Sequence, residues 1–256
     1  MSTNKEKILA RVRAANNRAG LSRPHEPLPE YVGGLESIRA EDLADRFCAE
    51  LQSVAGFCRQ AQSDEEIGDY LTSLLPRDAG KPVVALNHTV RASHPQIVEQ
   101  LTRQNVSLLY PPPSESAASA AGPGAESPSR DSRAAHLTDE YRRHLLDAVI
   151  GVTTADYAIA DTGTLVLLTG GEQHRLLSLL PLVHVCLLDA GRIVASLSHL
   201  LNHARPKFNA DATPPQAMTF ITGPSRTADV EQTISMGVHG PHQVHVIIHQ
   251  TRSPAQ

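Results

Sequence analysis

The amino-acid sequence predicts an α/β fold in which helices cover both faces of a sheet. Segments with helical periodicity alternate with short apolar segments along most of the 256 residues, and this alternation is typical of α/β proteins. The segment Leu165–Leu168 is apolar on both faces, as expected for a strand buried between two layers. With 41% hydrophobic residues, the chain can also fill a sizeable core.

The N-terminal residues predict a helical arm followed by a tether. Apolar residues recur at helical spacing within residues 4–17, among lysines and arginines, which indicates a basic amphipathic helix. Three prolines within residues 20–34 predict a loop. We therefore expect residues 1–35 to form an arm that packs on the chain's own body or docks on a partner. Residues 36–256 are expected to form the α/β domain.

The first half of this domain predicts helices and strands in alternation. A stripe of apolar side chains predicts a helix over residues 41–59. Ser63 and Glu66 match a capping box, so a second helix is expected to begin after Ser63 and to end before Pro76. The next expected elements are a strand at residues 82–86, a helix at 94–104 and a strand at 106–110.

Residues 111–133 interrupt the alternation. Pro, Ser, Ala and Gly fill nearly all of residues 111–130, and this composition cannot bury enough apolar surface to offset the entropy of ordering. We expect a flexible, protease-sensitive insertion within one domain rather than a boundary between two domains.

The alternation resumes after the insertion and continues almost to the end of the chain. The expected elements are a helix at 138–147, strands at 149–152, 157–160, 164–169 and 183–188, a helix at 193–204, a strand at 218–222, a helix at 227–235 and a strand at 244–249.

The composition excludes several classes of function. A net charge of −4 and only nine aromatic residues (four Phe and five Tyr) argue against a nucleic-acid-binding protein. No apolar run is long enough to predict membrane insertion. The sequence Met1–Lys7 lacks the apolar stretch of a secretory signal, so a cytoplasmic location is expected.

The three cysteines, Cys48, Cys58 and Cys186, are expected to be small, buried and inert. Their odd number argues against a disulfide framework. No Cys-x-x-Cys pair occurs, so the chain lacks the usual thiolate ligands of an iron–sulfur cluster. We therefore expect this chain to bind no cofactor by itself.

A first candidate site is the polar turn Asp161–Thr164 between two apolar strands. Gly163 permits a tight turn and close approach of the backbone to a ligand. Asp161 is a candidate catalytic acid, base or orienting group, and Thr162 and Thr164 offer hydroxyl groups. The alternative is a hairpin turn whose polar side chains satisfy their own backbone.

A second candidate site is the segment Gly223–Thr227, which joins the expected strand to the expected helix at 227–235. Free N–H groups at a helix N-terminus attract anions, and Arg226 adds a guanidinium donor. Asp229 and Glu231 would repel a bound anion unless they hold Arg226 or contact a hydroxylated part of the ligand. The alternative is an ordinary capped helix. Motifs for ATP and NAD are absent.

The thirteen histidines do not predict a metal site. His199 and His203 have the spacing that places two imidazoles on one helix face, but no third ligand accompanies them. The remaining group at the C-terminal end, His239, His242, His245 and His249, has no specific spacing.

Four segments resemble the LutC/YkgG lactate utilisation proteins, which share the LUD domain. These segments are Gly151–Thr169, Arg175 with Ser178–His184, Ile221–Thr233 and Gly237–Pro241. The resemblance implies a three-layer α/β sandwich of the NagB/RpiA/CoA-transferase type. It also implies a subunit that acts with iron–sulfur partner proteins in the oxidation of L-lactate to pyruvate, with the clusters in the partner chains.

The resemblance assigns no catalytic residue, but it marks a set of signature positions as expected ligand-binding residues. Asp161 stands where many relatives carry glutamate, so a carboxylate is retained with a different reach. The signature positions are Thr162, Gly163, Thr164, Arg175, Gly223, Ser225, Arg226, Thr227, Asp229 and Glu231.

Two other functions remain open from the sequence. One is a stand-alone enzyme of the CoA-transferase or sugar-phosphate isomerase type, and the other is a non-catalytic ligand-binding or assembly factor. In each case we expect the turns at Asp161–Thr164 and Gly223–Thr227 to converge on one pocket at the carboxyl ends of strands. Arg226 or Arg175 would face a small carboxylate or a phosphorylated metabolite there.

Overall fold

The computed structural model describes most of the α/β domain. The described ranges are 40–76, 80–112, 139–169, 175–209, 217–228, 234–237 and 239–249, with a few isolated positions. The fold below is that of residues 34–256, one of the two units into which the chain divides. Most of the expected arm at 1–35 lies outside the described residues, although Lys7, Ala10, Arg11 and Ala14 are helical. Residues 113–138, which make up nearly all of the expected insertion, lie outside them as well.

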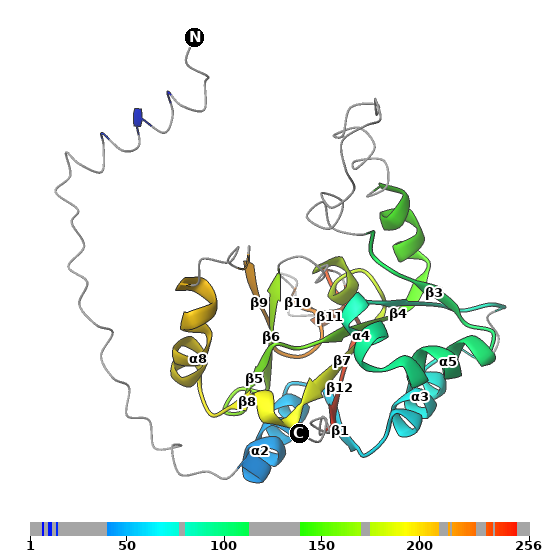
Figure 1. Ribbon diagram of the computed structural model, residues 1–256, viewed down its shortest axis with the longest axis horizontal. Helices are drawn as coiled ribbons and strands as arrows, with labels where there is room; N and C mark the ends of the chain where they lie inside the picture. The colour runs from blue at the N-terminus through cyan, green and yellow to red at the C-terminus, as the bar shows by residue number, and fades with distance from the viewer. Residues whose placement is uncertain are drawn as a thin grey trace. The chain divides into compact units, whose positions relative to one another are not determined.

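A six-stranded parallel sheet forms the centre of the domain, with the strand order β1-β12-β7-β4-β2-β3 (Figure 1). Its central strands are the most deeply buried. The bounds are β1 (Phe57–Ala61), β2 (Val83–Leu86), β3 (Ser107–Leu109), β4 (Ala148–Thr154), β7 (Val183–Asp189) and β12 (Gln243–His249).

Three helices cover one face of this sheet: α3 (Asp64–Ser73), α4 (His88–Ser93) and α5 (Pro95–Arg103). The capping box predicted for α3 is present in a shifted form. The Glu66 backbone N–H donates to Ser63 Oγ at 3.2 Å, and the Gln62 N–H donates to the Glu66 carboxylate at 2.8 Å. Apolar residues of the helices pack on the strands below them, among them Ile67, Leu71, Ile97, Leu101, Val84, Val185 and Ile247.

The other face is covered by α2 (Ala40–Ser53) and by a second sheet of four strands in the order β8-β5-β6-β9. Its strands are β5 (Tyr157–Ile159), β6 (Thr164–Thr169), β8 (Ile193–Val194) and β9 (Ala217–Ile221), and α8 (Leu197–Asn209) lies beside it (Figure 1). Leu165 packs toward α2 and Val166 packs toward α8. Strand β6 is therefore apolar on both faces, as predicted, because it lies between two layers.

The α/β class predicted from the sequence is confirmed, and most predicted elements are present. Among the short elements that were not expected, α4 precedes the predicted helix at His94, and β8 occupies the start of the helix predicted at 193–204. In the described part of the chain, no helix is both long and apolar enough to cross a membrane. The described residues also include a helix at 139–146 and the short helices η1 (Arg175–Ser178) and η2 (Ala190–Arg192).

The prediction of one helix over residues 41–59 is wrong. Helix α2 ends at Ser53, and the chain enters strand β1 at Phe57. Ala55 has a left-handed backbone with φ of 65°, and Gly56 lies so close to Leu51 that a Cβ there would be 2.5 Å from its Cδ1. The pairing of β1 with β12 decides this boundary, and the helical stripe in the sequence continues past it without a visible break.

The helix predicted at 227–235 is also wrong. The described residues form a hairpin of β10 (Arg226–Ala228) and β11 (Ile234–Met236), in which Thr227 pairs with Ser235. Thr227 and Ile234 are β-branched, which favours strands over helices. Asp229 and Glu231 lie outside the described residues.

The expectation of three unpaired cysteines is wrong for two of them. Cys48 of α2 and Cys58 of β1 form a disulfide bond, with Cα atoms 5.2 Å apart. The two segments are consecutive and pack against each other, so tertiary contact brings together two cysteines that share no motif. Cys186 is free and fully buried, as expected, and burial raises the pKa of its thiol to about 12.

Candidate functional site

The two turns predicted to form a site lie side by side. The hydroxyl oxygens of Thr164 and Thr222 are 2.8 Å apart, and Thr162 Oγ1 is 2.8 Å from Thr164 Oγ1. The antiparallel register of β6 and β9, continued by two residues, places Gly163 opposite Gly223. The structure therefore brings these signature residues together, although ligand binding by them stays a prediction.

Both glycines face the last turns of α2. Gly163 and Gly223 have φ values of +60° and +77°, which glycine adopts at little cost. A Cβ at Gly163 would lie 2.3 Å from the Leu51 backbone nitrogen, and a Cβ at Gly223 would lie 2.8 Å from the Val54 carbonyl oxygen. The backbone that approaches these glycines therefore belongs to α2 and to Val54 just after it, within the protein itself.

Arg226 also contacts the end of α2. Its Nη2 donates a hydrogen bond to the Val54 carbonyl oxygen, which lies just beyond the helix C-terminus, where a cation is favourable. The Ser225 N–H donates to the Pro241 carbonyl oxygen at 3.0 Å, two residues before β12. Arg226 thus stands at a helix C-terminus, and the helix N-terminus on which the predicted anion site depended is absent from this described segment.

These contacts place the two turns at the amino edge of the six-stranded sheet. Val54 precedes β1 and Pro241 precedes β12, so both partners belong to segments that enter parallel strands. The rule used to predict the shared pocket concerns the opposite, carboxyl edge. The two turns do end strands β5 and β9, but those strands belong to the second sheet.

Asp161 and Arg175 differ in their surroundings. The Asp161 backbone N–H donates to the Ala195 carbonyl oxygen at 3.1 Å, while its buried Oδ1 has no hydrogen-bond partner among the described residues. Arg175 is exposed and begins η1, which packs against β4 and β7. The structure therefore does not join Arg175 to the contacts that hold the two turns together.

The carboxyl edge of the six-stranded sheet contains a switch in chain direction between β2 and β4. The chain leaves β2 through α4 and α5 on one face, and it leaves β4 toward β5 of the second sheet on the other. Asn87, which follows β2, is fully buried. Its Oδ1 accepts from the Val90 N–H at 2.8 Å, and its Nδ2 donates to Thr154 Oγ1 at 3.4 Å. Open α/β sheets bind ligands at such positions.

Two histidines and an aspartate lie together at this same edge. His94 Nδ1 donates to Asp64 Oδ1 at 2.8 Å, because an ionised carboxylate can only accept. The rings of His94 and His249 meet edge to face with centroids 4.9 Å apart. Burial lowers the pKa of His249 below its ordinary 6.5, aided by His94 and opposed by the carboxylates of Asp189 and Asp64.

This cluster of His94, His249 and Asp64 was not predicted from the sequence. Asp64 falls at the start of the helix expected after Ser63, and His94 falls at the start of the helix expected at 94–104, with neither assigned to a site. His249 belonged to a group of histidines without specific spacing. The sole available signal was that each residue stands at the end of a predicted strand or the start of a predicted helix, where carboxyl-edge residues of parallel sheets are found.

Three other histidines in the described part of the domain make contacts typical of structural residues. His184 is fully buried and shares a hydrogen bond of 2.9 Å with Thr153 Oγ1, and burial lowers its pKa to about 4. His245 stacks on Phe57, and burial lowers its pKa to about 4 as well. His203 Nδ1 donates to the carbonyl oxygen of its own helix at His199. Among the described residues, no group of three or more His, Cys, Asp or Glu is arranged to hold a metal ion.

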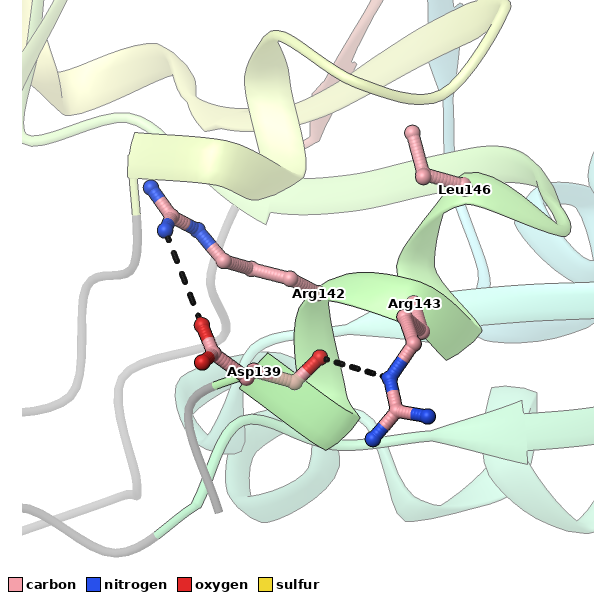
Figure 2. Close-up of a pocket in the computed structure, with 4 residues that line it drawn as sticks. All are labelled: Asp139, Arg142, Arg143 and Leu146. Carbon is pink, nitrogen blue, oxygen red and sulfur yellow. Dashed lines mark hydrogen bonds and ion pairs between the residues drawn. The ribbon is translucent and has the colours of Figure 1, made fainter. Parts of the chain in front are cut away.

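A hollow of about 410 Å³ lies on the helix at 139–146 (Figure 2). All its lining residues come from this one helix: Asp139, Arg142, Arg143 and Leu146. Arg142 forms a long ion pair of 3.9 Å with Asp139, and Arg143 Nε donates to the Asp139 carbonyl oxygen at 3.4 Å. The hollow is thus the surface of a single helix, whereas the carboxyl-edge residues come from several elements.

Comparisons with known proteins agree with this architecture. Lactate utilization protein C of Halalkalibacterium halodurans is 36% identical over 105 residues, which are 41% of this chain and 46% of that protein. Lactate utilization protein C of Bacillus subtilis is 33% identical over 94 residues, 37% of this chain and 39% of that protein. These alignments span less than half of each relative.

A solved structure of a DUF162 family protein from Deinococcus radiodurans has a similar fold, with a TM-score of 0.51 and 17% sequence identity. The likeness covers 83% of this chain and 99% of that one. The LUD domain family matches residues 44–249, which include both sheets and most of the helices described above. This chain therefore belongs to the LUD domain family.

Proposed function

We propose that this chain is a subunit of an L-lactate oxidation system, in which it acts with iron–sulfur partner proteins to convert L-lactate to pyruvate. Its similarity to proteins named Lactate utilization protein C supports a role in lactate utilisation. The subunit role and the reaction are our own extension, because the alignments span less than half of those relatives.

The observation that carries the proposal is the acid–base cluster at the carboxyl edge. Oxidation of a hydroxy acid removes a proton from its hydroxyl group, and a neutral histidine can accept that proton as a general base. His249 is such a group, and Asp64 fixes the ring of the neighbouring His94. The cluster thus provides proton-exchanging groups where α/β folds bind ligands.

The number and pairing of the cysteines support the proposal that the redox centres are bound by partner proteins. The chain has three cysteines, of which Cys48 and Cys58 are joined to each other and Cys186 is buried in the core. A usual iron–sulfur cluster needs four thiolates. Electrons from lactate would therefore pass to clusters bound by other chains.

The test is copurification from the native host. A tagged chain is purified anaerobically from cells grown on L-lactate, and the bound proteins are analysed for iron and sulfide. We expect iron–sulfur proteins to copurify and the complex to reduce a dye with L-lactate, while the chain alone contains no stoichiometric iron. Cells grown without lactate are the control.

Two results would replace the proposal with another. Turnover of a CoA ester or a sugar phosphate by the isolated chain would indicate a stand-alone enzyme. Normal growth on L-lactate after deletion of the gene, together with purification of the chain without partners, would indicate a separate ligand-binding or assembly role.

A further inference from the structure

We propose that the carboxyl edge of the six-stranded sheet binds a small 2-hydroxy acid, whose hydroxyl group donates a hydrogen bond to His249. Asp64 acts as a positioning residue that holds His94 against His249, and Arg192 supplies positive charge for the carboxylate. The class of ligand rests on the proposed function, whereas the place of the site rests on the geometry below.

Four elements bring their ends together around His249. His249 ends β12, Asp189 ends β7, Asp64 begins α3, and His94 precedes α5. Strands β12 and β7 pair in parallel, and His249 is opposite Asp189 in the register. Residues far apart in the sequence therefore converge at one edge, which is the arrangement that ligand sites in parallel sheets share.

The orientation of the two imidazole rings is fixed by named contacts. Asp64 accepts the Nδ1–H of His94 at 2.8 Å, so His94 keeps its Nε2 for another interaction. The rings of His94 and His249 are nearly perpendicular, at 89°. The His94 side chain is only 10% exposed and that of Asp64 is 21% exposed. The hydrogen bond between them is therefore largely shielded from competing water.

The charges that face His249 leave it neutral at physiological pH. They come from four elements or their ends: His94 before α5, Asp64 on α3, Asp189 on β7 and Arg192 on η2. Burial is the largest influence and lowers the pKa of His249 below 6.5, and His94 and Arg192 lower it further against the two carboxylates. A neutral imidazole has one nitrogen that can accept a hydrogen bond from a hydroxyl group.

Arg192 is the cation beside this acceptor. It is exposed, and its Nη1 donates a hydrogen bond of 3.4 Å to the Asp156 carbonyl oxygen. A guanidinium has five N–H donors, so it can still bind a carboxylate in a bidentate manner. A hydroxyl acceptor next to a carboxylate-binding group matches the two polar ends of a 2-hydroxy acid.

The experiment compares L-lactate with propionate, which has the carboxylate but lacks the hydroxyl group. Binding to the purified full-length chain is measured by calorimetry at pH 7.5. We expect L-lactate to bind about tenfold more tightly than propionate, as one hydrogen bond allows. His249→Phe keeps a ring against His94 and should abolish this preference, while His249→Gln restores an acceptor and should recover part of it. His203→Gln, on the surface of α8, should change nothing.

The pH dependence of the preference for L-lactate tests whether Asp64 acts on His249 or only stabilises the fold. The preference for L-lactate should disappear as the pH falls through the pKa of His249, because a protonated ring no longer accepts the hydrogen bond. Asp64→Asn should shift the midpoint of that profile, and a purely structural role of Asp64 would leave it unchanged. Arg192→Ala should weaken L-lactate and propionate equally.

Two outcomes would overturn this inference. One is that neither anion binds, and the other is that His249→Phe keeps the full preference for L-lactate. If the copurification experiment succeeds while binding fails, the proposed function stands and the site is elsewhere. If binding succeeds and no partner copurifies, the site stands and the role in a lactate oxidation complex fails.

Discussion

The hydroxyl oxygens of Thr164 and Thr222 lie 2.8 Å apart, although the two residues are 58 positions apart in the chain. This contact joins the turn before β6 to the end of β9, directly beside the last turns of α2. Gly163 and Gly223 next to it approach α2 so closely that no side chain fits. The signature residues Thr162, Gly163, Thr164 and Gly223 thus belong to a packed junction between the second sheet and α2.

Gly163→Ala should strongly destabilise the fold. The new Cβ would lie 2.3 Å from the Leu51 backbone nitrogen, and the residue has φ of +60°, so we expect a loss of about 3 kcal/mol or more in the free energy of unfolding. Urea denaturation measures this loss. Gly80→Ala is the matched control, because a Cβ there meets no atom within 4 Å. Equal midpoints for the two variants would contradict the packing described here.

Arg226→Ala should lower the free energy of unfolding by about 1 kcal/mol, the usual scale for a cation at a helix C-terminus. The reason is loss of the hydrogen bond from Arg226 to the Val54 carbonyl oxygen. Arg226→Lys keeps the charge and should recover part of the loss. If the stability is unchanged but the affinity for phosphate falls, Arg226 serves the anion site predicted from the sequence instead.

Removal of the disulfide should reduce stability by about 3 kcal/mol, because Cys48 and Cys58 are 10 residues apart and the bond restricts the unfolded chain. A Cys48→Ser/Cys58→Ser variant is compared with the wild type in urea, with and without a reducing agent. Reduction should lower the midpoint of the wild type to that of the variant. A variant midpoint that still falls on reduction would contradict this assignment.

Stability should decrease on acidification because of His184. Its pKa is about 4 in the folded chain and near 6.5 when unfolded, so the unfolded state takes up a proton first as the pH falls. The stability is complete above pH 6.5 and is lost progressively toward pH 4, by about 3 kcal/mol for this residue. Urea midpoints measured between pH 7.5 and 4.5 provide the test.

The matched variants for this pH effect are His184→Gln and His203→Gln. The first cannot titrate and should reduce the pH dependence, with the contribution of His245 remaining, while the second replaces a histidine on the surface of α8 and should preserve the full pH dependence. If His184→Gln has the same pH dependence as the wild type, the loss of stability comes from other groups.

Local signals in the sequence predicted much of the fold correctly. Ser63 and Glu66 predicted the start of α3. The apolar residues on both faces of Leu165–Leu168 predicted a strand between two layers. Such features depend on neighbours in the chain, since capping and side-chain periodicity act over a few residues. The same reasoning placed helices at 41–59 and 227–235, where pairing of distant or adjacent strands prevailed over periodicity.

Some features of the candidate sites could be predicted from the sequence, and others could not. The sequence indicated a tight turn at Gly163 that allows close approach of the backbone to a ligand, whereas in the structure the group that approaches Gly163 is the backbone of α2. It gave no means of joining Asp64, His94 and His249, because their proximity arises from the order of parallel strands.

The sequence by itself determined the α/β class, the extent of most strands and the membership in the LUD domain family, because these depend on local composition and on motifs within continuous segments. Only the tertiary structure decided which strands pair, that Cys48 meets Cys58 and that His249 meets His94. The physical reason is that these contacts are selected by burial of the whole core, to which residues distant in the chain contribute together.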